Sequence, residues 1–231
     1  MCGIYGSISE DAADLVLEGL RKLEYRGYDS AGLAATFSSE DEQIETERTT
    51  GYVSDLMLKA NGRFAGAKIS IGHTRWATHG GVTDYNAHPH SSKDGKITLV
   101  HNGIIENYEV LKKDLIQKGY KFHSETDTEV FIKFIEDIQL HNKCSLEEAL
   151  RLALHKVVGA YAIVLINKEE PDTLIAARKG SPLVIGVGED EYFLASDATP
   201  IIEYTNKVVY LDDYEIAVIR NNRLQVKTIE N

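Results

Sequence analysis

The chain has 231 residues, 43% of them hydrophobic, which is enough for one large domain or two small ones with a substantial core. Its 36 acidic and 25 basic side chains leave a net charge of -11, which disfavours binding to nucleic acid and to anionic lipid. Only two cysteines are present, and no secretory signal or apolar run of roughly 20 residues occurs. We therefore predict a cytoplasmic globular protein without nucleic-acid or membrane partners.

The first fifty residues predict a strand, a helix and a hairpin. Residues 2–8 have the composition of a short buried strand. The stretch 31–50 is rich in polar and β-branched residues around an acidic segment, 38–42, which favours a hairpin with a solvated turn. Between them, apolar residues recur at helical spacing: Ala13, Val16, Leu17, Leu20 and Leu23.

The middle of the chain predicts three helices, over about 107–118, over 126–140 and from Ser145 onward. The last two begin with the pattern of a capping box, a hydroxyl followed three residues later by a carboxylate. These pairs are Thr126 with Glu129, and Ser145 with Glu148. The helix over 126–140 has an apolar face that we expect to pack against a sheet: Val130, Phe131, Phe134, Ile135 and Ile138.

From Val157 onward, short apolar runs alternate with residues that favour chain reversal, a pattern typical of antiparallel sheet. Together with the helices, this pattern predicts a single α+β domain of layered sheets and helices. The six predicted strands span 161–166, 173–177, 183–187, 192–195, 208–211 and 215–219.

Cys2 follows the initiator methionine, so removal of Met1 would place a thiol and a free α-amino group on one residue. An α-amine has a pKa near about 8 and can accept the thiol proton close to neutral pH. Cys2 is therefore a candidate N-terminal nucleophile. The alternative is a small residue at a frayed chain end.

Five of the eight histidines lie between His73 and His101, in a segment that also contains the only tryptophan, Trp76. Glycines bound the part 72–81, which we interpret as a lid that closes over a substrate. The alternative is an irregular loop that covers the core.

A metal site is a second interpretation of this segment. His88 and His90 are one residue apart and could ligate one metal ion, with Asp84 and one further histidine completing a hydrolytic centre. The further ligand would be His73, His79 or His101.

Asn102 and Gly103 follow the apolar run 97–100 and precede a helix, which predicts that they lie at the end of a strand. The side-chain NH2 of asparagine and the backbone N–H of glycine could stabilise the oxyanion of a tetrahedral intermediate. Asn-Gly is also a common turn dipeptide, so the sequence supports both interpretations.

Asp127 lies at a predicted helix start, where an acidic residue is explained by the helix dipole. Asp127 and Arg75 would also match the two charged groups of an amino acid, if the fold brings them together.

These segments together resemble the glutaminase domain (glutamine amidotransferase type 2) of the glucosamine-6-phosphate synthases, which are N-terminal-nucleophile hydrolases. The resemblance implies a four-layer αββα sandwich of two antiparallel sheets between helical layers, without cofactor or metal, in which His88 and His90 are scaffold. The similar blocks span 1–4, 25–32, 72–80, 86–90, 101–108, 124–130 and 180–183.

The resemblance also implies a role for each site residue. Cys2 would attack the side-chain amide of L-glutamine, and Asn102 and Gly103 would form the oxyanion hole. Arg26 would brace the N-terminal strand.

For the substrate, the resemblance implies that Arg75 holds the α-carboxylate and Asp127 the α-ammonium group. Thr78 and His79 would line the site, and Trp76 would move with the lid.

The enzymes of this family continue into a sugar-isomerase half that binds fructose 6-phosphate, which the present sequence, 1–231, lacks. We therefore expect an isolated glutaminase domain that hydrolyses glutamine, with amino-sugar synthesis belonging to a longer parent chain. The alternatives are a metal-dependent hydrolase built on the histidines and a glutamine-binding module without turnover.

Overall fold

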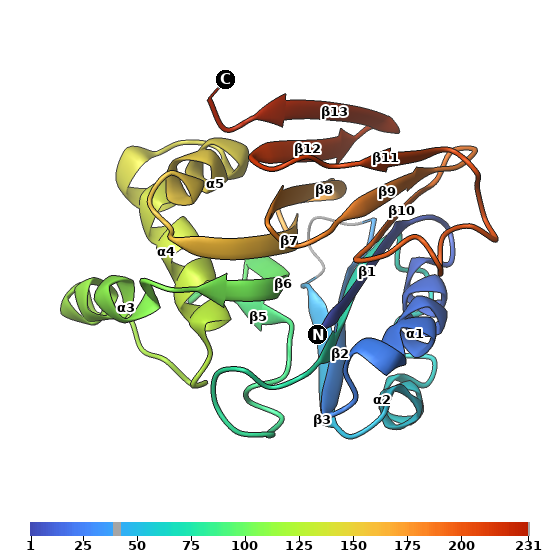
Figure 1. Cartoon of the computed structure of the whole chain (residues 1–231), viewed down its shortest axis with the longest axis horizontal. Helices are drawn as coiled ribbons and strands as arrows, with labels where there is room; N and C mark the ends of the chain where they lie inside the picture. The colour runs from blue at the N-terminus through green and yellow to red at the C-terminus, as the bar shows by residue number, and fades with distance from the viewer. Residues whose placement is uncertain (39–42, 231) are drawn as a thin grey trace.

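A computed structural model describes residues 1–38 and 43–230, which form two antiparallel sheets (Figure 1). The seven-stranded sheet has the order β11-β9-β10-β1-β4-β2-β3, and the six-stranded sheet has the order β13-β12-β8-β7-β6-β5. The first sheet comprises β1 (Gly3–Ile8), β2 (Ser30–Thr36), β3 (Glu45–Thr50), β4 (Ile69–Arg75), β9 (Val184–Val187), β10 (Tyr192–Ala195) and β11 (Val208–Tyr210). The second comprises β5 (His90–Ser91), β6 (Ile97–Ile105), β7 (Gly159–Asn167), β8 (Glu170–Lys179), β12 (Glu215–Arg220) and β13 (Arg223–Thr228).

Helices cover the outer face of each sheet, so the molecule has the four αββα layers implied by the resemblance (Figure 1). The seven-stranded sheet is covered by α1 (Ala12–Leu23) and α2 (Val53–Ala60). On the other side lie α3 (Tyr108–Gln117), α4 (Asp127–Asn142) and α5 (Leu146–Leu154). No helix among the described residues is long and apolar enough to cross a membrane.

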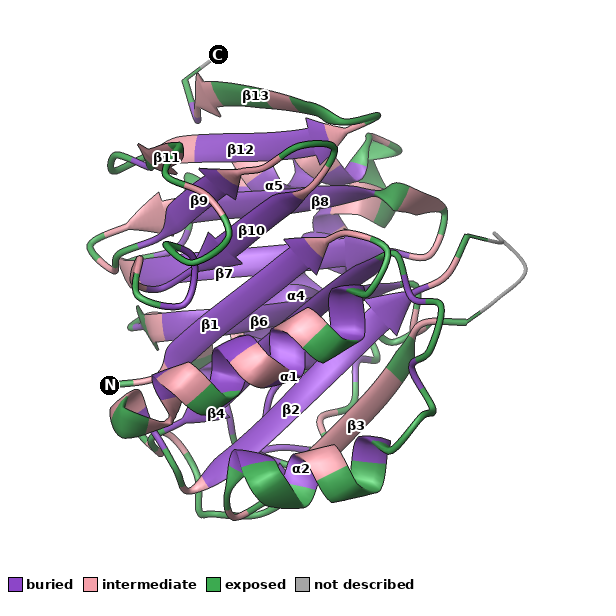
Figure 2. Ribbon diagram, turned by 90° about the vertical axis from the view of Figure 1, so that its right-hand side faces the viewer, coloured by how far each residue is buried: buried purple, intermediate pink, exposed green. Residues whose placement is uncertain are grey.

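Three apolar cores fill the spaces between the four layers. Strand β1 contributes to two of them because successive side chains point to opposite faces of a sheet. Ile4 packs between the two sheets, whereas Tyr5 packs under α1. Both faces of the central strands are therefore buried, and Figure 2 shows β1 and β2 buried while β3 and β13, at the sheet margins, are more exposed.

Most predicted elements are confirmed within one to three residues at each end. The five-residue stripe of the first helix is buried, as is the predicted apolar face of α4. Strands β2 and β3 form the predicted hairpin, although most of its acidic turn lies outside the described residues. The six predicted strands after residue 157 all form, but they divide between the two sheets. Helix α2 and strands β4, β5 and β13 were not predicted.

The two capping boxes form only in part. The hydroxyl oxygens of Thr126 and Ser145 accept the N–H groups of Glu129 and Glu148, both at 3.2 Å. The reciprocal bonds are replaced by others. The carboxylate of Glu129 accepts from the backbone of His123 and Ser124, and the carboxylate of Glu148 pairs with Arg151. Each carboxylate thus finds a stronger partner than the single backbone N–H at the cap: several amides for Glu129, and a positive charge for Glu148.

Gly32 in β2 allows the segment before β5 to cross the sheet. A Cβ atom at Gly32 would lie 2.0 Å from the carbonyl oxygen of His88, far inside van der Waals contact. The absence of a side chain at Gly32 thus positions the segment 86–90 against β2 and β3.

We predict that Gly32→Ala lowers the free energy of unfolding by at least about 2 kcal/mol, because backbone atoms cannot move away without disturbing the sheet. Gly81→Ala is the matched control, since a Cβ atom there meets open space. Urea unfolding monitored by circular dichroism measures both changes, and equal stability of the two variants would contradict the prediction.

Candidate active site

The pairing of β1 with β4 places Cys2 beside Trp76. Gly3 is paired with Thr74, so the start of β1 lies next to the end of β4. The sulfur of Cys2 accepts the N–H of Trp76 at 3.3 Å and lies 3.5 Å from its carbonyl oxygen. Both contacts involve backbone atoms, which hold the thiol at a defined position.

The carbonyl group of Cys2 is held from two directions. It accepts a hydrogen bond from Nε of Arg26 at 2.9 Å and one from Nδ2 of Asn102 at 3.1 Å. Arg26 is itself 3.6 Å from a carboxylate oxygen of Asp197. These contacts brace the N-terminal strand.

A cavity of about 330 Å³ opens at Cys2. The two residues before β1, the ends of β4 and β6, the start of α4 and the segment after β8 contribute to its wall. Eight of the nine predicted site residues line it: Cys2, Arg26, Arg75, Trp76, Thr78, Asn102, Gly103 and Asp127. The ninth, His79, does not; its ring packs edge-on against Tyr108, with 5.0 Å between the ring centroids.

The prediction of a lid over 72–81 is wrong for residues 72–75. Residues 72–75 belong to β4, a buried strand paired with both β1 and β2, and cannot move as a loop. Only the segment after Arg75 leaves the sheet. The guanidinium of Arg75 donates to the carbonyls of His79 at 2.5 Å and of Gly81 at 2.9 Å, and so ties this segment back onto the strand.

Asn102 and Gly103 do not lie at a strand end as predicted, and they form no turn. Strand β6 continues to Ile105, with Asn102 opposite Ala162 and Gly103 opposite Tyr161 in β7. Gly103 has φ of 114° and passes so close to β7 that a Cβ atom would lie 2.2 Å from the carbonyl oxygen of Ala160. Pairing along the whole of β7 therefore overrides the turn tendency of Asn-Gly.

Asp127 is buried in the first turn of α4, and its Oδ2 atom accepts the backbone N–H of Ile105 at 2.8 Å. This bond joins the helix start to the end of β6. Asp127 and Arg75 line the same cavity, as the amino-acid interpretation requires.

The histidines form a buried cluster. The rings of His73 and His88 stack with centroids 3.9 Å apart, and Nε2 of His73 lies 3.0 Å from Oδ1 of Asn102. Since Oδ1 can only accept, Nε2 of His73 donates and orients the asparagine amide. Among the described residues, no group of three or more His, Cys, Asp or Glu side chains could hold a metal ion.

Burial keeps these histidines neutral. It lowers the pKa of His73 and of His90 to about 3, from an ordinary value of 6.5, because the charged imidazolium loses its hydration. Burial likewise raises the pKa of the Cys2 thiol, partly offset by the bond from Trp76. The thiol therefore needs a base to become a nucleophile.

Two parts of the site were not predicted. The carboxylate of Asp29 accepts the N–H of Ala77 at 2.5 Å and holds the segment after β4. Ser181 and Pro182 form the far wall of the cavity. Both lie within blocks of the family resemblance, which was the only available signal, since no spacing rule links them to Cys2.

The sequence profile of a family described as a glutamine amidotransferase domain matches residues 73–203. The chain belongs to this family. The match includes most of the cavity wall, from β4 to the segment after β8, and the resemblance seen in the sequence is confirmed. The protein is thus an amidotransferase-family enzyme.

Similar proteins include two named glutamine–fructose-6-phosphate aminotransferase (isomerizing). The protein from Bacteroides thetaiotaomicron is 53% identical over 233 residues, and that from Chlorobaculum tepidum is 52% identical over 236 residues. Each match covers 100% of this amidotransferase chain and 38% of the relative. The chain therefore spans well under half the length of these proteins.

Solved structures share the fold. The glutamine phosphoribosylpyrophosphate amidotransferase of B. subtilis, complexed with ADP and GMP, matches with a TM-score of 0.84 and 25% identity over 99% of this chain and 49% of that one. A glutamine aminotransferase class-II domain protein from Silicibacter pomeroyi matches with a TM-score of 0.63 and 12% identity over 98% of this chain and 99% of that one. These likenesses confirm the four-layer sandwich.

We predict that acid destabilises the fold through the neutral histidines. Above pH 6.5 a histidine is neutral in both states, but below it the unfolded chain binds a proton that folded His90 excludes until about pH 3. Each such histidine lowers the free energy of unfolding by about 1.4 kcal/mol per pH unit within this window.

Urea unfolding between pH 4 and 5.5 checks this effect in His90→Gln, with His141→Asn on the exposed end of α4 as control. The slope of stability against pH should be shallower in His90→Gln only. Equal slopes in both variants would contradict the assignment.

Proposed function

We propose that this chain hydrolyses L-glutamine to glutamate and ammonia, with Cys2 as the nucleophile. The observation that supports this most directly is the position of the Cys2 sulfur, fixed by Trp76 in a cavity that also contains Asn102 and Gly103. Family membership supports the same reaction class.

Met1 must first be removed, before any catalysis, and its 79% exposure leaves it accessible to an aminopeptidase. The freed α-amine of Cys2, directly or through a water, accepts the proton of the buried thiol. The thiolate attacks the side-chain carbonyl carbon of glutamine. The carbon–nitrogen bond then breaks as the leaving nitrogen takes the proton and departs as ammonia. A water hydrolyses the thioester, which releases glutamate and restores the thiol.

Asn102 and Gly103 stabilise the oxyanion formed in both steps. The amide of Asn102 is oriented by His73, so its NH2 group faces the Cys2 end of the cavity, where it now donates to the Cys2 carbonyl. A preorganised donor of this kind contributes about 3 kcal/mol to the transition state.

The charged groups of the substrate meet Arg75 and Asp127. Asp127 uses Oδ2 for the N–H of Ile105, which leaves Oδ1 for the α-ammonium group. Arg75 supplies positive charge for the α-carboxylate while holding the segment 76–81. We assign Thr78 and Trp76 to the rim of this site and His79 to a supporting position outside it.

In a longer parent chain, we propose that residues 1–231 are the glutaminase domain and that the remaining part aminates fructose 6-phosphate to glucosamine 6-phosphate. The names of the relatives and the share of their length that this chain covers support this larger reaction. The cytoplasm supplies both substrates, and we place the protein there.

We predict that Cys2→Ala lowers glutamate release from processed protein at least about a thousandfold, because the thiol that forms the thioester is removed. Cys144→Ala is the matched control, since Cys144 packs beside the core around α4 and α5 and does not line the cavity. A coupled glutamate assay measures both, after intact-mass analysis has verified that Met1 is absent.

Equal rates of glutamate release by Cys2→Ala and by the unaltered chain would exclude Cys2 as the nucleophile. Chelation serves as a further control. We expect full glutaminase activity after exhaustive chelation. A loss of activity that an added metal ion restores would instead favour the metal-dependent hydrolase built on the histidines.

We also predict that Asn102→Ala lowers kcat for glutamine by about a hundredfold to a thousandfold with little change in KM, because the oxyanion exists only after attack. Asn206→Ala, on an exposed loop, is the control. A change in KM alone would assign Asn102 to substrate binding instead.

A further inference from the structure

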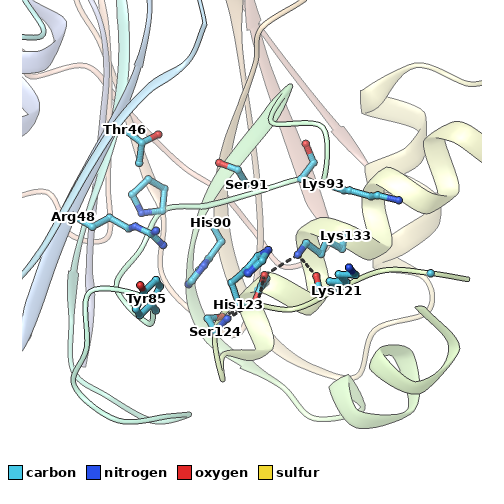
Figure 3. A pocket seen from close by; sticks show the side chains of 14 residues that line it. Thr46, Arg48, Tyr85, His90, Ser91, Lys93, Lys121, His123, Ser124 and Lys133 are labelled. Carbon is cyan, nitrogen blue, oxygen red and sulfur yellow. Dashed lines mark hydrogen bonds and ion pairs between the residues drawn. The ribbon is translucent and has the colours of Figure 1, made fainter. Parts of the chain in front are cut away.

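The structure has a second cavity, of about 590 Å³, next to the catalytic cavity. Figure 3 shows the side chains that line it. The two cavities share no lining residue. The dividing wall is formed by the segment 88–90, in which His88 faces the catalytic cavity while Pro89 and His90 line the second one. This second cavity has no role in the reaction proposed above.

The lining of this cavity is cationic although the chain has a net charge of -11. Four basic side chains line it against a single carboxylate, that of Glu129. They come from segments far apart in sequence: Arg48 from β3, Lys93 from the turn after β5, Lys121 from the segment between α3 and α4, and Lys133 from α4.

Glu129 is already neutralised. Its buried carboxylate lies 2.7 Å from the ammonium group of Lys133, and this ammonium group also donates to the carbonyl of Lys121. Glu129 further accepts the N–H groups of His123 and Ser124. The one carboxylate and the one buried lysine therefore compensate each other.

The other three cations have no such partner. Within residues 1–38 and 43–230, none of Arg48, Lys93 and Lys121 forms an ion pair. Lys93 lies over the ring of Tyr120 at the rim, at 5.6 Å from its centroid. The carboxylates of Asp84, Glu129 and Glu47 act on the Arg48 guanidinium without forming an ion pair with it. The lining still carries more basic than acidic side chains, which favours an anionic ligand.

Arg48 is the most informative of the three. It is half-buried, and its guanidinium donates one hydrogen bond, to the carbonyl of Ala87 at the long distance of 3.4 Å. Burial also lowers the pKa of Arg48. A guanidinium has five donors in a fixed fork that matches carboxylate and phosphate oxygens, so most of its capacity is unused here.

The opposite wall presents the lysines. Figure 3 shows Arg48 on one side of His90, and Lys121, His123 and Lys133 on the other. His90 between them is neutral and lies with Nε2 3.2 Å from the hydroxyl of Thr126. Hydroxyl groups of Tyr85 and Ser91 complete the polar lining.

We propose that this cavity binds a phosphate monoester of a small metabolite, with the phosphate between Arg48 and Lys121. A dianionic phosphate matches two or three unpaired cations better than a single carboxylate does. The volume exceeds that of a phosphate ion and leaves room for the organic part, for which Tyr85 offers an exposed aromatic ring at the mouth. A zwitterion such as glutamine is disfavoured because Glu129, the one carboxylate among the described lining residues, is already paired with Lys133.

Isothermal titration calorimetry at constant ionic strength tests the site on the 231-residue chain, with inorganic phosphate and glycerol 3-phosphate as probes and chloride as the reference salt. We expect one saturable site for glycerol 3-phosphate, with weaker binding of inorganic phosphate. Tighter binding of inorganic phosphate would identify the free ion as the ligand and overturn the monoester. Absence of saturation for both probes by about 10 mM would overturn the site.

Variants locate the binding. Lys121→Gln and Arg48→Gln should each raise the Kd for glycerol 3-phosphate at least about tenfold. Arg48→Lys should recover only part of this loss, because an ammonium group lacks the fork. Lys113→Gln and Lys207→Gln, at exposed positions outside the cavity, remove the same charge and should leave the Kd unchanged.

Equal weakening by Lys207→Gln and Lys121→Gln would show diffuse attraction and overturn the site. Thermal unfolding in chloride verifies that each variant folds. If Arg48→Gln does not fold, Lys121→Gln tests the site alone, because Lys121 is exposed and its replacement leaves the core intact. The proposal is independent of glutamine hydrolysis, because Cys2→Ala should bind glycerol 3-phosphate with the Kd of the unaltered chain.

Discussion

The structure depends on the insertion of the first strand between two others. Strand β1 is paired with β4 on one side and β10 on the other, and Ser196 closes the end of this pairing through bonds with both backbone groups of Ile4. A chain end is ordinarily free to fray. Here the ladder on both edges, together with Arg26 and Asn102, fixes a reactive thiol to within hydrogen-bonding distance of Trp76. The apolar layers on both faces of β1 make this position rigid.

Local patterns predicted much of the fold, and their failures have identifiable causes. The stripe from Ala13 to Leu23 repeats at helical spacing because one face of α1 lies on the sheet. The division of the later strands into two sheets could not be read from the sequence, since β9 and β12 have similar apolar patterns but pair with different partners. The segment 72–75 resembled a loop because His73 and Arg75 are polar. Both are buried, with His73 bonded to Asn102 on β6 and Arg75 bonded to a carbonyl of the segment that follows β4.

The candidate site was predicted from motifs more completely than from physical pattern. Position and spacing alone left Cys2, Asn102, Gly103 and Asp127 each with a structural alternative, and the motifs decided between them. The structure shows why these alternatives and the functional roles coexist: Asp127 serves the helix start and also lines the cavity, and Asn102 lies in a strand and also reaches Cys2. Such double use is not visible in a sequence, because it depends on contacts across 22 to 100 residues.

The place of β1 in the sheet also constrains the order of folding. Its partners lie about 70 and 190 residues downstream, so both edges of β1 can be paired only after β10 has been synthesised. Contacts of such long range are formed late and slowly compared with helices and hairpins. Until then at least one edge of β1 stays unpaired, which leaves the N-terminus accessible to processing enzymes while the ribosome completes the rest. The reactive thiol becomes enclosed only when nearly the whole domain exists, which couples the chemical competence of the first residues to the integrity of the last strands.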